Sequence, residues 1–218
     1  MRKLGIIVGL IALLGLTANA QSYTGTGIGL RAGEPSGITV KLYTGNSAFE
    51  FNFGTSIWSW GFANVNRRAL KAAEANKPHT TDVITSYDVY YSSRRIGLQA
   101  IYQPIFSGFS LGTLTGFFWY VGFGAQLNFG TLAWEAWYDH PDEAWAWWGA
   151  YDHYLTGTMP DIDIGPVGMG GVEWILADYN IPLALSVDLA VFMEVFDHPM
   201  GKFYLLGNSS IKLLIGEL

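Results

Sequence analysis

Eight charged side chains occupy the polar positions of segments in which polar and apolar residues alternate. Four are basic and four are acidic: Arg31, Lys41, Arg95, Lys212, Glu50, Glu173, Asp188 and Glu194. Such alternation places one set of side chains on one face of a β-strand. If those faces line a narrow interior, unpaired charges there would carry a large desolvation penalty. The eight residues therefore predict a network of ion pairs that plugs the interior, with a conducting or gated pore as the alternative.

A second group of chemically active side chains is aromatic, and we interpret its segment, residues 130–160, as a loop. Five of the nine Trp lie between Trp134 and Trp148, and the segment holds five acidic residues but no Lys or Arg. Indoles left in water would promote aggregation, so they are expected to cover a neighbouring surface, to sit at a membrane interface or to anchor a partner protein. Stacking on a sugar is a further alternative. The predicted contact residues are Trp134, Trp137, Tyr138, Trp145, Trp147 and Trp148.

A short basic helix is expected over residues 64–76. Asn64 is a suitable N-cap, the following residues favour helix, and Pro78 ends it. Arg67, Arg68 and Lys71 give it a basic face. That face is either solvated or in contact with phosphate groups or with the acidic Trp-rich segment.

Catalytic patterns are weak. All four His fall in expected loops, and the sequence contains no Gly-x-Ser-x-Gly elbow, phosphate loop or His-Glu-x-x-His motif. The acidic and His residues between 139 and 153 lack a diagnostic metal-ligand spacing, and there is no Cys. We therefore predict no enzymatic activity, no catalytic residue, no metal and no cofactor.

The elements that must position these side chains follow from composition and periodicity. The 218 residues are 50% hydrophobic, only 14% charged, and carry a net charge of −6, which excludes a disordered chain and a protein that binds nucleic acid through bulk charge. Arg2 and Lys3, an apolar run from Leu4 to Leu16, and Ala18-Asn19-Ala20 are typical of a signal peptide over residues 1–20. Residues 21–218 are then one exported domain.

Alternation with a period of two recurs over that domain. The expected strands lie near residues 23–33, 37–44, 49–57, 88–103, 117–129, 161–176, 183–195 and 205–217. Several exceed ordinary soluble strands and match the 9–11 residues with which a tilted strand crosses a bilayer. The apolar positions carry bulky aromatics and the polar positions carry Gly, Ser, Asn and Gln, which favours a membrane barrel over a soluble sandwich.

The spacing of the strands predicts an up-and-down topology. The expected outer loops are about 34–36, 58–87, 130–160 and 196–204, and the inner turns about 45–47, 104–116 and 177–182. The two longest connections fall on the same side, as in barrels with long extracellular loops and short periplasmic turns. The predicted fold is an eight-stranded antiparallel transmembrane β-barrel with a short helix in the second extracellular loop.

Three stretches resemble the small porin-like outer-membrane β-barrels of Gram-negative bacteria. Gly27 to Lys41, read as GIGLRAGEPSGITVK, is similar to the first hairpin of that family, and Trp119 to Ala125 is similar to its central aromatic-glycine strand. Ile181-Pro182-Leu183, with Ser186 and Asp188, resembles its seventh strand. The resemblance implies an eight-stranded barrel in the outer membrane, and most members of the family have no assigned activity.

The functional hypothesis is a non-enzymatic outer-membrane barrel with a charge-plugged lumen. It would act through its extracellular loops, as a structural element or as a subunit of an outer-membrane complex. The expected partners are outer-membrane lipid and lipopolysaccharide, and another envelope protein. The alternatives are a small porin-like channel and a lipid-modifying enzyme of the outer membrane.

Overall fold

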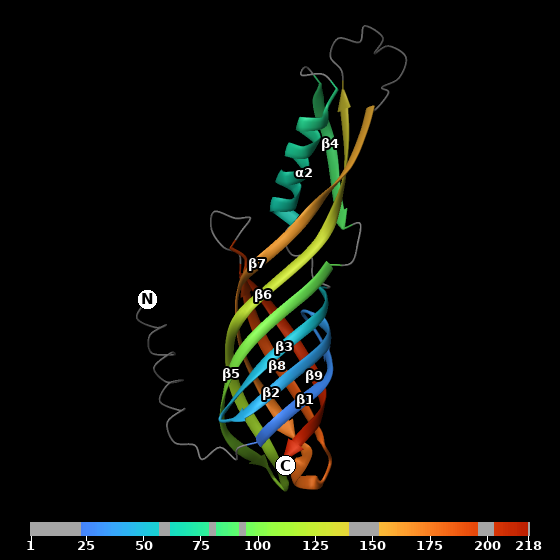
Figure 1. The fold of residues 1–218 in the computed structure, drawn as a ribbon. Helices are drawn as coiled ribbons and strands as arrows, with labels where there is room; N and C mark the ends of the chain where they lie inside the picture. The colour runs from blue at the N-terminus through green and yellow to red at the C-terminus, as the bar shows by residue number, and fades with distance from the viewer. Residues whose placement is uncertain are drawn as a thin grey trace, which may run out of the picture.

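The computed structural model describes residues 23–56, 62–78, 82–91, 95–139, 153–195 and 203–217. The expected signal peptide, residues 1–20, lies outside these ranges, and so do Trp145, Trp147 and Trp148. The described elements are nine strands, one α-helix and one turn of 3-10 helix (Figure 1). In chain order they are β1 Tyr23–Ala32, β2 Ser36–Gly45, β3 Ser47–Ser56, α2 Phe62–Asn76, β4 Val83–Tyr91, β5 Arg95–Leu111, β6 Leu114–Asp139, β7 His153–Ile175, η2 Leu176–Tyr179, β8 Leu183–Met193 and β9 Phe203–Glu217.

Eight of the strands form one sheet that closes on itself. Each strand pairs antiparallel with the next in the order β5–β3–β2–β1–β9–β8–β7, and β6 completes the ring by pairing with both β5 and β7. The predicted eight-stranded antiparallel barrel is confirmed. The ninth strand, β4, lies outside the ring and pairs with the far part of β6.

The two faces of the barrel strands have opposite character, as the alternation predicts. On β8, Ser186 and Asp188 are buried in the lumen, whereas Val187 and Leu189, between and beside them, are 66% and 61% exposed on the outer wall. The same inversion holds on β3, where Glu50 and Asn52 are buried and Phe51 is exposed. The outer wall is therefore apolar, and the charged and polar side chains of these strands lie in the lumen.

Three turns lie at one end of the barrel, which we call the turn end, where β9 also ends (Figure 1). Gly45 and Gly112 take positive φ values of 83° and 63° in two of them, and Asn180 adopts the left-handed conformation in the third. The first and third turns lie where the sequence predicts them. The predicted turn over residues 104–116 is wrong, because β5 and β6 continue until only Gly112 and Thr113 separate them.

Cross-strand aromatic contacts explain this extension. The rings of Phe106 and Trp119 stack with their centroids 4.3 Å apart, and those of Phe109 and Phe117 stack at 5.4 Å. Such pairs stabilise neighbouring strands by up to about 1 kcal/mol each. The hairpin therefore persists through two register shifts between Phe106 and Leu111.

At the opposite end, β6 and β7 run on beyond the ring (Figure 1). Their pairing is unbroken from Phe117 opposite Trp174 to Tyr138 opposite His153. The predicted outer loop over residues 130–160 is therefore wrong at both ends, since residues 130–139 and 153–160 are strand. The physical reason is that the period-two pattern continues through Leu132, Trp134 and Ala136, and that β4 supplies a backbone partner for this part of β6.

The predicted strand over residues 88–103 is two strands that lie end to end along β6. β4 pairs with β6 as far as Tyr91 opposite Leu132, and β5 takes over at Ile96 opposite Phe129. The predicted loop 58–87 accordingly contains α2 and the start of β4. The predicted helix is confirmed, and it begins two residues earlier than expected, at Phe62.

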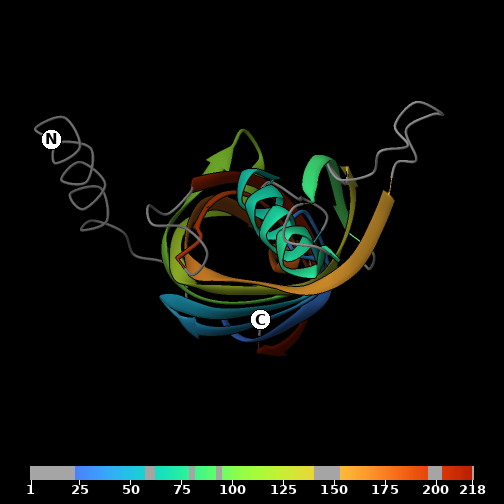
Figure 2. The same cartoon turned by 90° about the horizontal axis from the view of Figure 1, so that it is seen from above.

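We call the part beyond the ring the head: α2, β4, residues 130–139 of β6 and residues 153–160 of β7. From above, α2 lies over the barrel opening (Figure 2). The buried core of the head consists of Ala69, Ala73, Val89, Leu132, Trp134 and Ala136. Ala69 and Ala73 lie one helical turn apart, so α2 packs closely on the sheet. The Trp134 indole lies over Gly157, where an added Cβ would be 2.4 Å from the ring.

This packing makes Trp134 the anchor of the head, and Trp134→Ala should release α2. Removal of a buried Trp typically costs about 3–5 kcal/mol. A loss of that size would raise trypsin cleavage at Arg68 and Lys71 by roughly 150- to 4,000-fold. The matched control is Trp137→Ala, because Trp137 lies on the other face of β6, against Tyr154. Equal cleavage rates in the two variants would contradict this account of the head.

Candidate functional site

Six charged side chains meet in the middle of the lumen, and we call them the ion cluster. They are Arg31, Lys41, Lys212, Glu50, Glu173 and Asp188, and each side chain is at most 1% exposed. Three positive and three negative charges give a neutral group. Buried charges are tolerated only with close partners and further hydrogen bonds, so the geometry of each pair matters.

Arg31 holds two of the carboxylates. Its guanidinium lies 3.0 Å from a carboxylate oxygen of Glu50 and 3.0 Å from Oδ1 of Asp188. A second donation to Asp188 at 3.3 Å makes that contact bidentate. Two-point contact between planar groups fixes their relative orientation as well as their distance.

The two lysines share the remaining carboxylate. Lys41 Nζ and Lys212 Nζ lie 2.7 and 3.1 Å from the two oxygens of Glu173. Both ammonium groups also approach Oε2 of Glu50, at 3.9 and 3.8 Å. Glu50 therefore lies within 4 Å of all three cations and links the Arg31 and lysine sides of the cluster. The Lys41 ammonium also lies 4.5 Å from the centre of the Tyr120 ring, a cation–π contact.

All eight barrel strands contribute to this arrangement. The six charges come from β1, β2, β3, β7, β8 and β9. From β5, the Gln103 amide donates to Glu50 at 3.3 Å, and from β6, the Tyr120 hydroxyl donates to Asp188 at 3.1 Å. The cluster thus joins every wall of the barrel across its lumen.

Apolar side chains occupy the lumen on both sides of the ion cluster. Toward the turn end they are Tyr43, Ala48, Phe118, Ile175, Ala184 and Leu214. Toward the head they are Ile101, Tyr120, Val167, Met169, Ala190, Phe192 and Leu206. These layers keep the surroundings of the charges poorly solvated, which strengthens their mutual attraction and raises the penalty for separating them.

Arg95, which the sequence groups with these residues, belongs to a second set of charges at the rim. It pairs with Asp161, at 3.5 Å, and with Asp163. Asp161 also accepts a hydrogen bond from Arg68 of α2 at 3.0 Å, and Arg68 donates to the Pro160 carbonyl. Asp161 therefore joins the helix over the opening to the barrel wall.

The separation of Arg95 from the ion cluster is a matter of position along the strand. It lies six residues toward the head from Ile101, the residue opposite Glu50, which is about 20 Å along the strand. Alternation identifies the face of a residue but not its level in the barrel. Glu194, the eighth predicted member, is buried immediately beyond the end of β8.

Further polar lumen residues complete both groups. Asp161 and Asp163 share the parity of Glu173 on β7, so the same count would have found them. The alternation places the uncharged polar residues on the lumen face but does not predict their contacts. They include a chain of buried amides in which Asn52 donates to Gln99 at 2.8 Å, Gln99 to Gln126 at 2.7 Å and Gln126 to Asn128 at 3.2 Å.

The predicted loop-contact residues divide between the two faces of the head. Trp134 and Tyr138 are buried on the face toward α2, and Trp137 lies on the opposite face with its ring centroid 5.5 Å from that of Tyr154. On α2, Arg68 binds Asp161 and Lys71 is exposed, while Arg67 lies in the first half of the helix. The remaining three predicted Trp lie outside the described residues.

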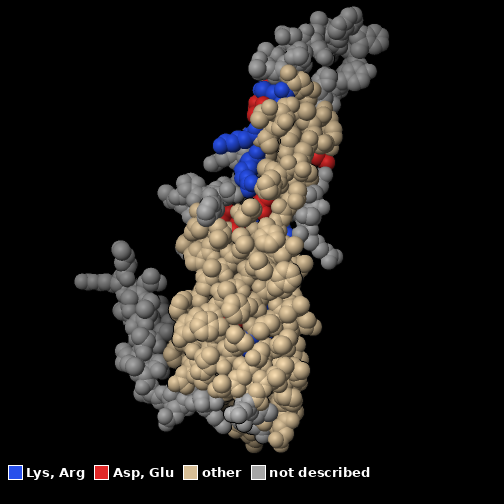
Figure 3. All heavy atoms as spheres, in the orientation of Figure 1, with Lys and Arg blue, Asp and Glu red and all other residues tan. Residues whose placement is uncertain are grey.

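The outer wall of the barrel is apolar on every side. All eight barrel strands carry at least one large apolar side chain that is 38% or more exposed. Examples are Leu30, Phe53, Phe123 and Leu205, at 65%, 53%, 61% and 73%. In the view of Figure 3 the barrel wall is almost free of charged side chains, and Lys and Arg gather on the part above it.

No family model and no curated protein matches this chain. In the described part of the chain, no helix is long and apolar enough to cross a membrane. Within those same ranges, no group of three or more His, Asp or Glu residues is arranged to hold a metal ion.

The coupling within the ion cluster leads to a test by charge removal. Glu173→Gln leaves two buried ammonium groups with one carboxylate fewer, and should lower the free energy of unfolding by about 3–5 kcal/mol. Adding Lys41→Met restores neutrality, so the double variant should lose less than the sum of the two single losses. Urea unfolding of the refolded protein in detergent measures both, with the exposed Lys71→Met as a control that should change stability by less than about 0.5 kcal/mol. Strictly additive losses would contradict the coupling.

Proposed function

We propose that this chain is a non-enzymatic β-barrel of the bacterial outer membrane. The ion cluster seals its lumen, and its head makes the contacts on which its function depends. It serves as a structural element or as a subunit of an outer-membrane complex. The observation that carries the proposal is the inside-out distribution of side chains, with charges paired in the lumen and apolar residues around the whole outer wall. A barrel in water would show the reverse.

Strand length and the apolar wall support the membrane location. β1, β2 and β3 each have 10 residues and β8 has 11, which matches the 9–11 residues of a strand that crosses the hydrocarbon core at a tilt. Exposed apolar surface that encircles a protein is far larger than soluble monomers carry. Lipid is the environment in which both features are stable.

The lengths of the connections support one orientation. Barrels of this kind place short turns in the periplasm and long connections outside. The three turns at Gly45, Gly112 and Asn180 then face the periplasm, and the head faces the cell exterior.

The filled lumen favours a sealed barrel over a pore. An ion moving through it would have to pass two apolar layers and separate charges that lie 2.7–3.1 Å apart. Separation of such pairs leaves uncompensated buried charge, which costs several kcal/mol. The proposal therefore assigns the function to the head.

Two features of the head support contact with the cell surface and with a partner. Lys71 is exposed on α2 and is available to lipopolysaccharide phosphates, whereas Arg68 is engaged by Asp161. On the opposite face, Trp137 contacts Tyr154, which is 50% exposed. Paired aromatics on an exterior surface are the residue types that dominate protein interfaces.

Membrane residence and closure are tested together. Expressed with its own N-terminal segment in a Gram-negative host, the protein should sediment with the outer-membrane fraction and resist extraction by carbonate. Refolded into planar bilayers, it should show no steady conductance in the nanosiemens range, because the ion cluster and its apolar layers fill the lumen. A water-soluble monomer would exclude the membrane location, and a stable nanosiemens channel would exclude the sealed lumen.

The role of the head is tested by single substitutions of Trp137 and Tyr154, on the face opposite α2. In mild detergent the native protein should co-purify with a stoichiometric partner, and Trp137→Ala or Tyr154→Ala should each weaken that association by about 2 kcal/mol, roughly 30-fold. The protease resistance of α2 reports that the head is still folded in these variants. A partner retained equally by both variants would show that this face is not the contact surface.

A further inference from the structure

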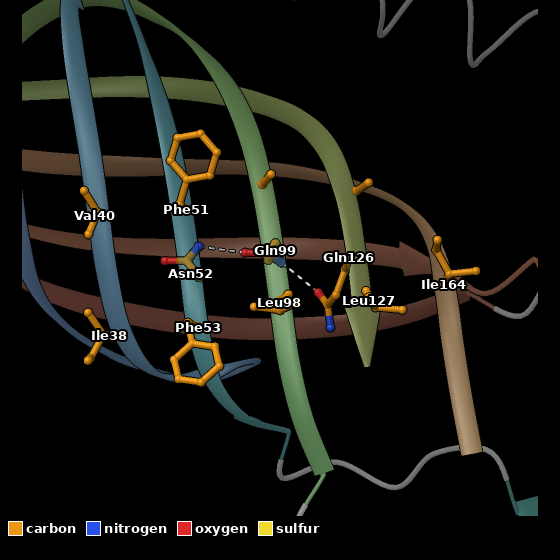
Figure 4. A pocket seen from close by; sticks show the side chains of 12 residues that line it. Ile38, Val40, Phe51, Asn52, Phe53, Leu98, Gln99, Gln126, Leu127 and Ile164 are labelled. Atoms are coloured by element: carbon orange, nitrogen blue, oxygen red, sulfur yellow. Dashed lines mark hydrogen bonds between the residues drawn. The ribbon is translucent and has the colours of Figure 1, made fainter. Parts of the chain in front are cut away.

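A shallow groove crosses the outer wall of the barrel at the position where two alanines lie side by side. Ala100 on β5 and Ala125 on β6 are opposite one another and both are exposed. The groove has a volume of about 380 Å³, within the range of small-molecule sites (Figure 4). Its outward-facing lining comes from five neighbouring strands and consists of Ile38, Val40, Phe51, Phe53, Leu98, Ala100, Ala125, Leu127 and Ile164.

The strand register explains why the groove is bounded on its long sides. The row two residues toward the head places Phe53, Leu98 and Leu127 opposite one another. The row two residues toward the turn end places Phe49, Tyr102 and Phe123 in line, with their ring centroids 5.1 and 5.4 Å apart. The two small methyl side chains therefore form a floor between two rows of bulky ones.

The ends of the floor are set in the same way. Phe51 stands beside Ala100 on β3, and Pro166 is opposite Ala125 on β7. Three inter-strand spacings separate β3 from β7, so the distance between these two ends is about 14 Å. A site of these dimensions suits a long and thin ligand better than a compact one.

The chemistry of the lining restricts the ligand to hydrocarbon. Every side chain that faces the groove is apolar. The three polar residues that border it, Asn52, Gln99 and Gln126, are buried on the lumen side and hydrogen-bond to one another (Figure 4). Among the outward-facing lining residues a ligand finds no hydrogen-bond donor, acceptor or charge, and in the two bordering rows only Tyr102 carries a polar group, so the groove favours hydrocarbon over headgroups, sugars and peptides.

The apolar wall on either side indicates where the hydrocarbon comes from. The exposed apolar side chains continue without a break from the groove onto all eight barrel strands. A protein partner would need such a surface on one side only, whereas lipid covers a barrel on all sides. The occupant that this continuity favours is one acyl chain of the surrounding bilayer.

We propose that the Ala100–Ala125 groove is a lipid-binding site that holds one acyl chain in a fixed position on the barrel wall. This inference rests on the proposed membrane location. The chain lies against the methyl floor, between the Leu98 row and the Tyr102 row, and its headgroup remains outside the groove.

The experiment uses the full-length protein in vesicles that contain a small fraction of phosphatidylethanolamine with a diazirine in its acyl chain. After illumination, peptide mass spectrometry locates the adducts. Adducts should be at least 5 times more frequent on groove residues than on Ile211 and Leu213 of β9, which lie on the far side of the ring and are 46% and 50% exposed. Ala125→Phe fills the groove and should reduce groove adducts at least 5-fold. Leu213→Phe, which places the same aromatic ring outside the groove, should leave them unchanged.

Three outcomes of the crosslinking experiment would contradict the lipid site. Uniform adducts over the outer wall, or groove adducts unchanged by both Ala125→Phe and Ala100→Phe, would overturn the lipid site while leaving the membrane location intact. Adducts that disappear as the protein-to-lipid ratio rises, together with dimers on native gels, would assign the groove to a second copy and also overturn it. Protein that fails to float with the vesicles would overturn both proposals. All three variants place bulk on an outer wall that is already exposed, so folding is checked in each by its heat-dependent gel shift.

Discussion

The neutrality of the ion cluster is the constraint on which the rest of this barrel depends. A lumen lined by Arg31, Lys41 and Lys212 is stable only if three carboxylates reach the same level from other strands. This requirement fixes the register of the strands against one another, since a shift of one residue would move a charge to the apolar outer wall. Gln103 and Tyr120 extend the constraint to the two strands that carry no member of the cluster.

The same constraint separates the two regions of the molecule. Inside the ring, charged groups between two apolar layers hold the walls together, and the outer wall is apolar as well. In the head the usual arrangement returns, with Trp134, Ala69 and Ala73 packed in an apolar core between helix and sheet. The change occurs at the rim, where Asp161 binds both Arg68 of the helix and Arg95 of the wall. The same two strands, β6 and β7, therefore contribute to an ion-paired lumen in the barrel and to an apolar core in the head.

Much of this arrangement could be predicted from the sequence, because alternation reports directly which face of a strand a residue occupies. It identified the barrel and the lumen face of Glu50, Glu173 and Lys212, whereas the helix followed from its helix-favouring residues and the proline after it. It could not assign the level of a residue along the barrel axis, which is why Arg95 was grouped with a cluster about 20 Å away. It also failed for residues 130–160, where acidic and aromatic residues suggested a loop although the alternation continued. The deciding factor there was the backbone pairing with β4, a contact between segments about 50 residues apart that local pattern does not report.

The continuous pairing of β6 with β7 also determines how the molecule responds to force. The two strands are hydrogen-bonded from Phe117–Trp174 at the turn end to Tyr138–His153 at the top of the head. A pull applied to the head along the strands loads these bonds in shear, so many of them must break together rather than one after another, because ladder bonds lie across the strand direction. Tension on the exposed end is thus delivered to the barrel wall and to the strands around it. The head is therefore joined to the barrel by continuous strands, and it would transmit a mechanical load to the barrel without first coming apart.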